Sequence, residues 1–112
     1  MRDPRERLLD ILEAIGHIER YAVRGRQAFE RDELIQNWFV HHLQSIGEAA
    51  RGLPADVLAK APDIPWSKIT GMRHILVHDY FNIDKDLVWD VVERDLPDLK
   101  GNIHAILQKL GR

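Results

Sequence analysis

The residues best suited to chemistry lie in one octet, residues 73–80, which reads Arg-His-Ile-Leu-Val-His-Asp-Tyr. It places a permanent cation (Arg73), a titratable imidazole (His78) and a phenol (Tyr80) beside an apolar run. Imidazole suits proton transfer because its unperturbed pKa of about 6.5 lies near neutral pH. Guanidinium suits phosphate because its planar fork matches phosphate oxygens and stays protonated. Arg73 and His78 are therefore the right pair for cleaving RNA without a metal.

The spacing inside the octet predicts that a second copy of the chain completes the site. Residues advance by about 100° per position in a regular helix, so Arg73 and Tyr80 fall on nearly the same face. His78 then points about 140° away from Arg73. Two copies facing each other across a twofold axis would bring Arg and His together from both chains. One His could then act as base and the other as acid.

Two other interpretations of the octet stay open at this point. An Arg and a His five residues apart occur by chance in many helices. His74 and His78 share a helical face at i and i+4, a spacing that suits zinc, but neither an HExxH glutamate nor a third ligand is evident. We therefore expect no metal and no cofactor.

The whole chain has the composition of one globular domain spanning residues 1–112. It has 112 residues, of which 45% are apolar and 30% charged, typical of a soluble protein. The longest apolar runs fall far short of the roughly 20 residues that span a bilayer, and the N-terminus lacks the apolar segment of a signal peptide. Cysteine is absent, which excludes disulfides and is compatible with a reducing cytoplasm.

The net charge of −2 argues against a protein that coats nucleic acid through bulk charge. Binding of RNA would need a local cluster of cations. The candidates are Arg20, Arg24, Arg26 and Arg31, with Lys68 and Arg73 further along. For the first four, solvent-exposed positions at a helix end are the favoured interpretation, and a phosphate-binding rim is the alternative.

Helical periodicity runs through the chain and predicts an all-α bundle. Asp3-Pro4 is a good helix start, with apolar residues at helical spacing up to Ala22. A second helix begins between residues 26 and 32, and small residues at 47, 49 and 50 would let another helix approach it closely. A short helix is expected over residues 55–61, a helix carrying the octet over 66–80, and a last helical segment after a turn and N-cap at residues 82–84. Pro97 interrupts the last segment, giving a kink or two abutting helices.

Several residues outside the octet have both a structural and a functional interpretation. Glu48 could pair with Arg73 and orient its guanidinium, or form an ordinary ion pair. Asp79 could hydrogen-bond to the octet or end its helix. His42 is favoured as a hydrogen-bonded core residue rather than a ligand. The three tryptophans could stack on bases, but core or interface positions are favoured: Trp38, Trp66 and Trp89.

The segment Gly71-Met72-Arg73-His74-Ile75-Leu76-Val77-His78-Asp79-Tyr80-Phe81 resembles the signature of HEPN-domain proteins of the HepT-like toxin family, an Arg, four residues, a His, one residue and a Tyr. Further similar residues lie at Ile46-Gly47-Glu48-Ala49, Pro65-Trp66 and Val88-Trp89, so the resemblance covers about residues 5–110. It implies a HEPN-type bundle of four to five helices with a kinked or broken C-terminal helix.

The resemblance also implies a function. The expected protein is a cytoplasmic ribonuclease toxin of a type VII-like toxin–antitoxin system, acting as a homodimer with a composite cleft that contains Arg73 and His78. Its expected partner is an antitoxin that resembles a minimal nucleotidyltransferase of the MntA type. In the family such an antitoxin can transfer AMP from ATP to the tyrosine of the motif, here Tyr80.

One residue departs from the family pattern. His74 stands where HepT-like proteins usually have Asn, and it could assist phosphate binding or alter substrate choice. The main alternative to catalysis is a non-catalytic helical module that binds a nucleotidyltransferase partner. A degenerate scaffold that serves only dimerisation is less favoured, because Arg73, His78 and Tyr80 are all present.

Overall fold

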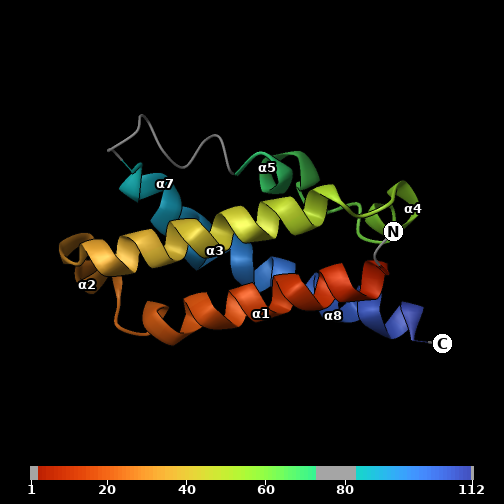
Figure 1. The fold of residues 1–112 in the computed structure, drawn as a ribbon, viewed down its shortest axis with the longest axis horizontal. Helices are drawn as coiled ribbons and strands as arrows, with labels where there is room; N and C mark the ends of the chain where they lie inside the picture. The colour runs from red at the N-terminus through yellow and green to blue at the C-terminus, as the bar shows by residue number, and fades with distance from the viewer. Residues whose placement is uncertain (1–2, 73–82, 112) are drawn as a thin grey trace.

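The structure, a computed structural model, describes residues 3–72 and 83–111, and every regular element within these ranges is helical (Figure 1). The expected all-α class is therefore confirmed. The elements are, in chain order, α1 (Pro4–Ala22), α2 (Arg26–Arg31), α3 (Glu33–Arg51), α4 (Ala55–Leu58), α5 (Trp66–Thr70), α7 (Lys85–Asp90), the π-helical turn η1 (Val91–Asp95) and α8 (Leu96–Leu110). No described helix is long and apolar enough to cross a membrane.

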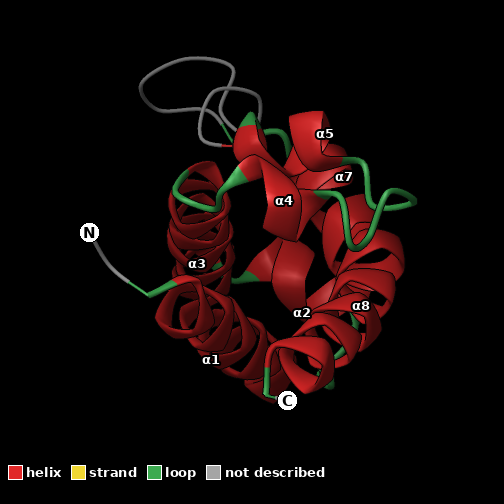
Figure 2. Cartoon of the chain, turned by 90° about the vertical axis from the view of Figure 1, so that its right-hand side faces the viewer, coloured by secondary structure: helices red, strands yellow, loops and turns green. Residues whose placement is uncertain are grey.

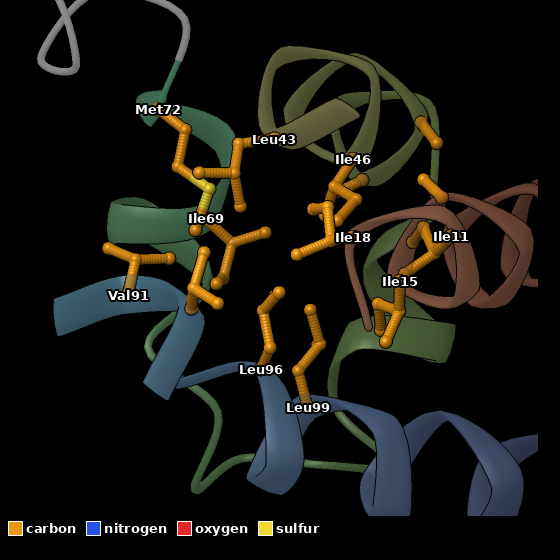
Figure 3. Close-up of a cluster of buried hydrophobic side chains, with 14 of the residues drawn as sticks. Ile11, Ile15, Ile18, Leu43, Ile46, Ile69, Met72, Val91, Leu96 and Leu99 are labelled. Carbon is orange, nitrogen blue, oxygen red and sulfur yellow. The ribbon is translucent and has the colours of Figure 1, made fainter. Parts of the chain in front are cut away.

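The long helices α1 and α3 form an antiparallel hairpin, and α8 packs against α1 (Figures 1 and 2). The short helices α5 and α7 lie along one side of α3, α5 toward its C-terminal half and α7 toward its N-terminal half (Figure 1). One continuous apolar core joins these helices, and Figure 3 labels part of it: Ile11, Ile15 and Ile18 of α1, Leu43 and Ile46 of α3, Ile69 and Met72 at α5, and Val91, Leu96 and Leu99.

The start of α1 confirms the expected cap. The Asp3 carboxylate accepts a hydrogen bond from the backbone N–H of Arg5 at 2.9 Å, and Pro4 occupies the first turn, where no N–H is needed. The chain leaves this helix through Gly25, whose φ of 90° favours glycine. The N-terminal helix therefore has the limits that its sequence predicts.

The second predicted helix is divided into α2 and α3 by one extended residue. Asp32 has φ −118° and ψ 106°, and its carboxylate accepts from the N–H of Leu34 at 2.9 Å, so it caps α3. The buried side chain of Gln36 donates to the carbonyls of Phe29 and Glu30 at 3.0 and 3.2 Å. These bonds satisfy carbonyl groups at the end of α2, which makes the break stable.

The interruption expected at Pro97 is a π-helical turn, η1, just ahead of the proline. The N–H of Leu96 donates to the carbonyl of Val91, five residues earlier, and α8 continues directly from there. Proline has no N–H to donate and its ring crowds the carbonyl four residues before it, so a wider turn ahead of Pro97 relieves the conflict. Val91 and Val92 remain buried in this turn.

Candidate functional site

Helix α5 leads directly into the octet. It ends at Thr70, Gly71 is its C-cap, and Met72 is the last described residue before Arg73. The side chains of Ile69 and Met72 are buried, with 1% and 0% exposed. Both anchor this end of the chain in the core beside Leu43 and Ile46 of α3 (Figure 3). The chain is therefore fixed up to Met72, whereas Arg73, His74, His78, Asp79 and Tyr80 lie outside the described residues.

Gly47 allows α5 to lie against α3. A Cβ atom at this position would stand 3.0 Å from the Ile69 carbonyl oxygen, 3.6 Å from that of Thr70 and 3.8 Å from the Met72 Cβ. The absence of a side chain therefore sets the distance between α3 and the backbone that precedes Arg73. This confirms the predicted close approach of another helix at Gly47.

We expect Gly47→Ala to lower the free energy of unfolding by about 1–2 kcal/mol, because the new methyl group meets backbone that cannot rotate away. Gly16→Ala is the matched control, since a Cβ on this exposed residue of α1 meets no atom within 4 Å in the described part of the chain. That control should be stabilised by about 0.5–1 kcal/mol through helix propensity. Urea denaturation of both variants measures the difference, and equal stabilisation of the two would contradict the close packing at Gly47.

Two polar contacts hold α5 from other directions. The indole N–H of Trp66 donates to the carbonyls of Leu58 and Ala61, both at 3.1 Å. The ammonium of Lys68 lies 2.6 Å from the Asp95 carboxylate at the end of η1. The helix that precedes the octet is therefore bound to α4 and to η1 as well as packed on α3.

The chain re-enters the described structure at Ile83, which packs half-buried against the core. Asp84 then caps α7, accepting from the N–H of Leu87 at 3.1 Å, as the sequence predicts. Helix α7 contacts both α2 and α3, and Arg26 pairs with Asp86 at 2.6 Å. The described residues before and after residues 73–82 are thus anchored near α3, Met72 in the core and α7 by its contacts with α3.

Glu48, the one proposed site residue within the described ranges, lines an open groove between α1 and α3. The groove has a volume of about 860 Å³ and polar walls, formed by Arg7 and Asp10 of α1 and His41, Gln44, Ser45, Glu48 and Ala49 of α3. Glu48 is exposed and directly follows Gly47, so its backbone is next to the contact with Ile69 and Met72. Its pairing with Arg73 stays a prediction.

A cluster of imidazole and aromatic rings lies on the same pair of helices, nearer the end that carries Tyr21. The rings of His17 and His42 stack with their centroids 4.8 Å apart, and Trp38 meets them edge-on at 5.6 and 4.4 Å. The indole N–H of Trp38 donates to the His17 carbonyl at 2.8 Å. The sequence favours a hydrogen-bonded core position for His42, but its buried Nε2 and the buried Nδ1 of His17 have no hydrogen-bond partner in the described structure.

Burial lowers the pKa of His42, and the nearby imidazoles of His17 and His41 lower it further against the opposing charge of Glu13. A His whose pKa falls on folding stabilises the fold fully above its unfolded pKa of about 6.5 and loses that stabilisation as pH falls. We therefore expect the melting temperature to fall less between about pH 8 and pH 5 in His42→Phe than in the wild type. His104→Gln, on the exposed side of α8, is the control, and an acid-induced fall that His42→Phe leaves unchanged would contradict the role of the cluster.

The remaining sequence candidates are mostly engaged in structural contacts. Arg26 binds Glu30 at 3.0 Å as well as Asp86, and the Arg24 guanidinium stacks over the Tyr21 ring at 4.8 Å. Trp89 is buried against Phe29, which confirms its core position. Trp66 and Trp38 also pack against the core. Among residues 3–72 and 83–111, no three metal-ligating side chains converge on one point.

Comparison with known proteins identifies the family. The family model described as "Ribonuclease HepT-like" matches residues 11–106. A protein of Caldanaerobacter subterraneus subsp. tengcongensis that carries the name "Putative RNase" is 34% identical over 97% of this chain and 98% of its own length. The "Probable ribonuclease HepT" of Thermococcus cleftensis is 35% identical over 94% of this chain and 96% of its own length. No solved structure matches significantly. The chain belongs to the HepT-like ribonuclease family, as its motif predicts.

Sequence reasoning missed two features of this region. The Lys68–Asp95 pair joins residues 27 positions apart, and the stacked His17–His42 pair joins two different helices. Only the second pair had a signal in the sequence, because the helical periodicity of α3 places His42 on its inward-facing apolar side. Neither contact could be located before the packing of the helices was known.

Proposed function

We propose that this protein is a metal-independent endoribonuclease that uses Arg73 and His78 and acts as the toxin of a type VII-like toxin–antitoxin system. The observation that carries the proposal is the family match over residues 11–106, which spans the complete Arg-x4-His-x-Tyr motif. The described structure is consistent with it, because Gly47, Trp66 and Lys68 all hold the helix that leads into this motif.

The reaction follows from the chemistry of the two side chains. A neutral His78 removes the proton from a 2′-hydroxyl, and the resulting oxygen attacks the adjacent phosphorus. Arg73 neutralises the charge that develops on the phosphorane. The 5′-oxygen leaves with a proton from a second, protonated imidazole, so the products are a 2′,3′-cyclic phosphate and a 5′-hydroxyl. Protons and charge balance without a metal.

The second imidazole is assigned to His78 of another copy of the chain. The angular separation expected between Arg73 and His78 in a regular helix favours a site built from two copies. His74, Glu48 and Asp79 are assigned supporting roles in this cleft, His74 toward substrate phosphate and Glu48 toward the Arg73 guanidinium. The proposed assembly is a homodimer with a composite site.

Control of the ribonuclease is assigned to Tyr80 and to an antitoxin of the minimal nucleotidyltransferase class. The phenol oxygen of Tyr80 would attack the α-phosphorus of ATP, form a phosphodiester with AMP and release pyrophosphate. The added group carries bulk and a negative charge close to Arg73 in sequence. It would therefore compete with the phosphate of RNA.

The test is RNA cleavage by the purified protein in EDTA, with products analysed for 2′,3′-cyclic phosphate ends. Cleavage that persists in EDTA supports the proposed function. Loss of cleavage on chelation, restored by a divalent metal, would overturn metal independence. A wild-type protein that cuts no RNA, yet binds a nucleotidyltransferase in the presence of ATP, would instead identify a non-catalytic module.

A further inference from the structure

Helix α5 is too short to keep its position without tertiary contacts. It has five residues, Trp66–Thr70, well below the length at which an isolated helix is stable. Its orientation must therefore come from its neighbours. Because only Gly71 and Met72 separate α5 from Arg73, a rotation or shift of α5 moves the point at which the chain enters the octet.

The packing of α5 is incomplete on the side that faces α8. A small cavity of about 190 Å³ lies there, bounded by Ile64, Pro65 and Ile69 and by Asp95, Asp98, Leu99 and Asn102. Close packing therefore does not fix the distance between α5 and the start of α8 on this side. A polar contact beside the cavity can fix it instead.

The Lys68–Asp95 ion pair is that contact. The Lys68 Nζ lies 2.6 Å from the Asp95 Oδ2, and the two side chains are only 34% and 23% exposed. The Lys100–Glu19 pair, which joins α8 to α1, is longer at 3.0 Å and more exposed, at 43% and 49%. Partial burial limits solvent screening, so the Lys68–Asp95 pair is the better of the two at holding a fixed geometry.

The position of Asp95 depends in turn on the π-helical turn. Asp95 is the last residue of η1, where backbone hydrogen bonds span five residues. An α-helical turn at the same place would rotate Asp95 about the helix axis relative to the buried Val91 and Val92. The π-helical turn therefore accommodates Pro97 and also determines the direction in which the Asp95 carboxylate points.

We propose that Lys68 and Asp95 are a positioning pair for the ribonuclease reaction, whose ion pair fixes α5 and thereby the start of the segment that carries Arg73. This inference rests on the proposed function. It also assigns Lys68 a role different from that of a phosphate ligand, which its charge and its place five residues before Arg73 would otherwise suggest.

Asp95→Asn separates the two roles because they predict opposite effects. If Lys68 positions α5 through Asp95, removing the carboxylate lowers kcat. If Lys68 binds substrate phosphate, removing the competing carboxylate frees the ammonium and lowers KM, most strongly at low salt. The sign of the change therefore identifies the role.

The experiment measures kcat, KM and melting temperature for Lys68→Met, Asp95→Asn and Lys68→Arg, at low and high salt, on one cleavable RNA. We expect kcat to fall about tenfold in the first two variants, since small displacements of a reacting group cost at least this much. KM should change by less than about twofold, and Lys68→Arg should retain near wild-type kcat because it keeps the ion pair. Lys100→Met and Glu19→Gln are the matched controls, with an ion pair broken elsewhere and kcat unchanged.

The outcomes distinguish this inference from the proposed function. A wild type that cleaves RNA while Asp95→Asn keeps full kcat overturns the positioning role alone. A fall of KM in Asp95→Asn overturns it in favour of a phosphate ligand. An equal loss of kcat in the Lys100→Met control shows a general effect of destabilisation and also overturns it. A wild type inert on every RNA overturns the proposed function and the inference with it.

Discussion

Replacing His78 by Ala should lower kcat for RNA cleavage by about 10²- to 10⁴-fold, because a positioned acid–base group contributes that much to proton transfer. Replacing Arg73 by Ala should cost about 10²- to 10³-fold, the usual loss when a group that stabilises developing charge is removed. Arg73→Lys keeps the charge but loses the planar fork, so it should recover only part of the activity. Circular dichroism checks that the helical content is unchanged.

His104→Ala is the matched control for the imidazole, because His104 is exposed on α8 and has no assigned role. Cleavage that survives in His78→Ala, or that falls equally in His104→Ala, would remove His78 from the reaction. Separate assays of binding and of single-turnover cleavage assign each loss to KM or to kcat.

Mixed dimers test whether two imidazoles serve one site. If both copies of His78 are needed, only dimers of two wild-type chains are active, and at equal mixing with His78→Ala about a quarter of the activity remains. If each chain holds its own complete site, about half remains, as expected from simple dilution. Activity measured against the wild-type fraction is therefore quadratic for a site that needs both imidazoles. A straight line would contradict the use of two imidazoles in one site.

The long helices could be predicted from the sequence because their signals are local. The apolar period of α1, the Asp3-Pro4 start and the Asp84 cap each follow from residues within a few positions. The break at Asp32 depended on more distant contacts, since it is stabilised by Gln36 bonding back to the end of α2. The π-turn ahead of Pro97 likewise reflects a compromise between proline geometry and the burial of Val91, which periodicity alone does not resolve.

The chemical motif could be read from the sequence, but its support could not. The sequence identifies Gly47 as a small residue, but the backbone that requires it, the Ile69 carbonyl, is known only from the packing of α5 on α3. Sequence shows the charge of Lys68 but not its partner, so it allows a phosphate ligand, whereas the structure pairs Lys68 with Asp95. The contacts that hold the helix before the motif in place therefore join residues far apart in the chain, and the sequence alone does not reveal them.

Co-expression with an antitoxin of the minimal nucleotidyltransferase class should add AMP to the wild type and abolish its cleavage of RNA. Tyr80→Phe should gain no mass and remain active under the same conditions, because it keeps the ring but lacks the oxygen that would accept AMP. The loss of AMP transfer should be complete, because phenylalanine offers no nucleophilic oxygen at this position. Intact-protein mass spectrometry, followed by RNA cleavage of the same sample, measures both consequences.

Tyr21→Phe is the matched control, because Tyr21 is the other tyrosine in the chain and packs half-buried against Trp38 on the hairpin of α1 and α3. It should be modified as fully as the wild type. AMP found on Tyr80→Phe, or lost in Tyr21→Phe, would move the acceptor away from the motif. A wild type that is inhibited without gaining mass would show control by binding alone. In that case Tyr80→Phe would be neutralised as readily as the wild type, so the same pair of measurements separates covalent control from occlusion.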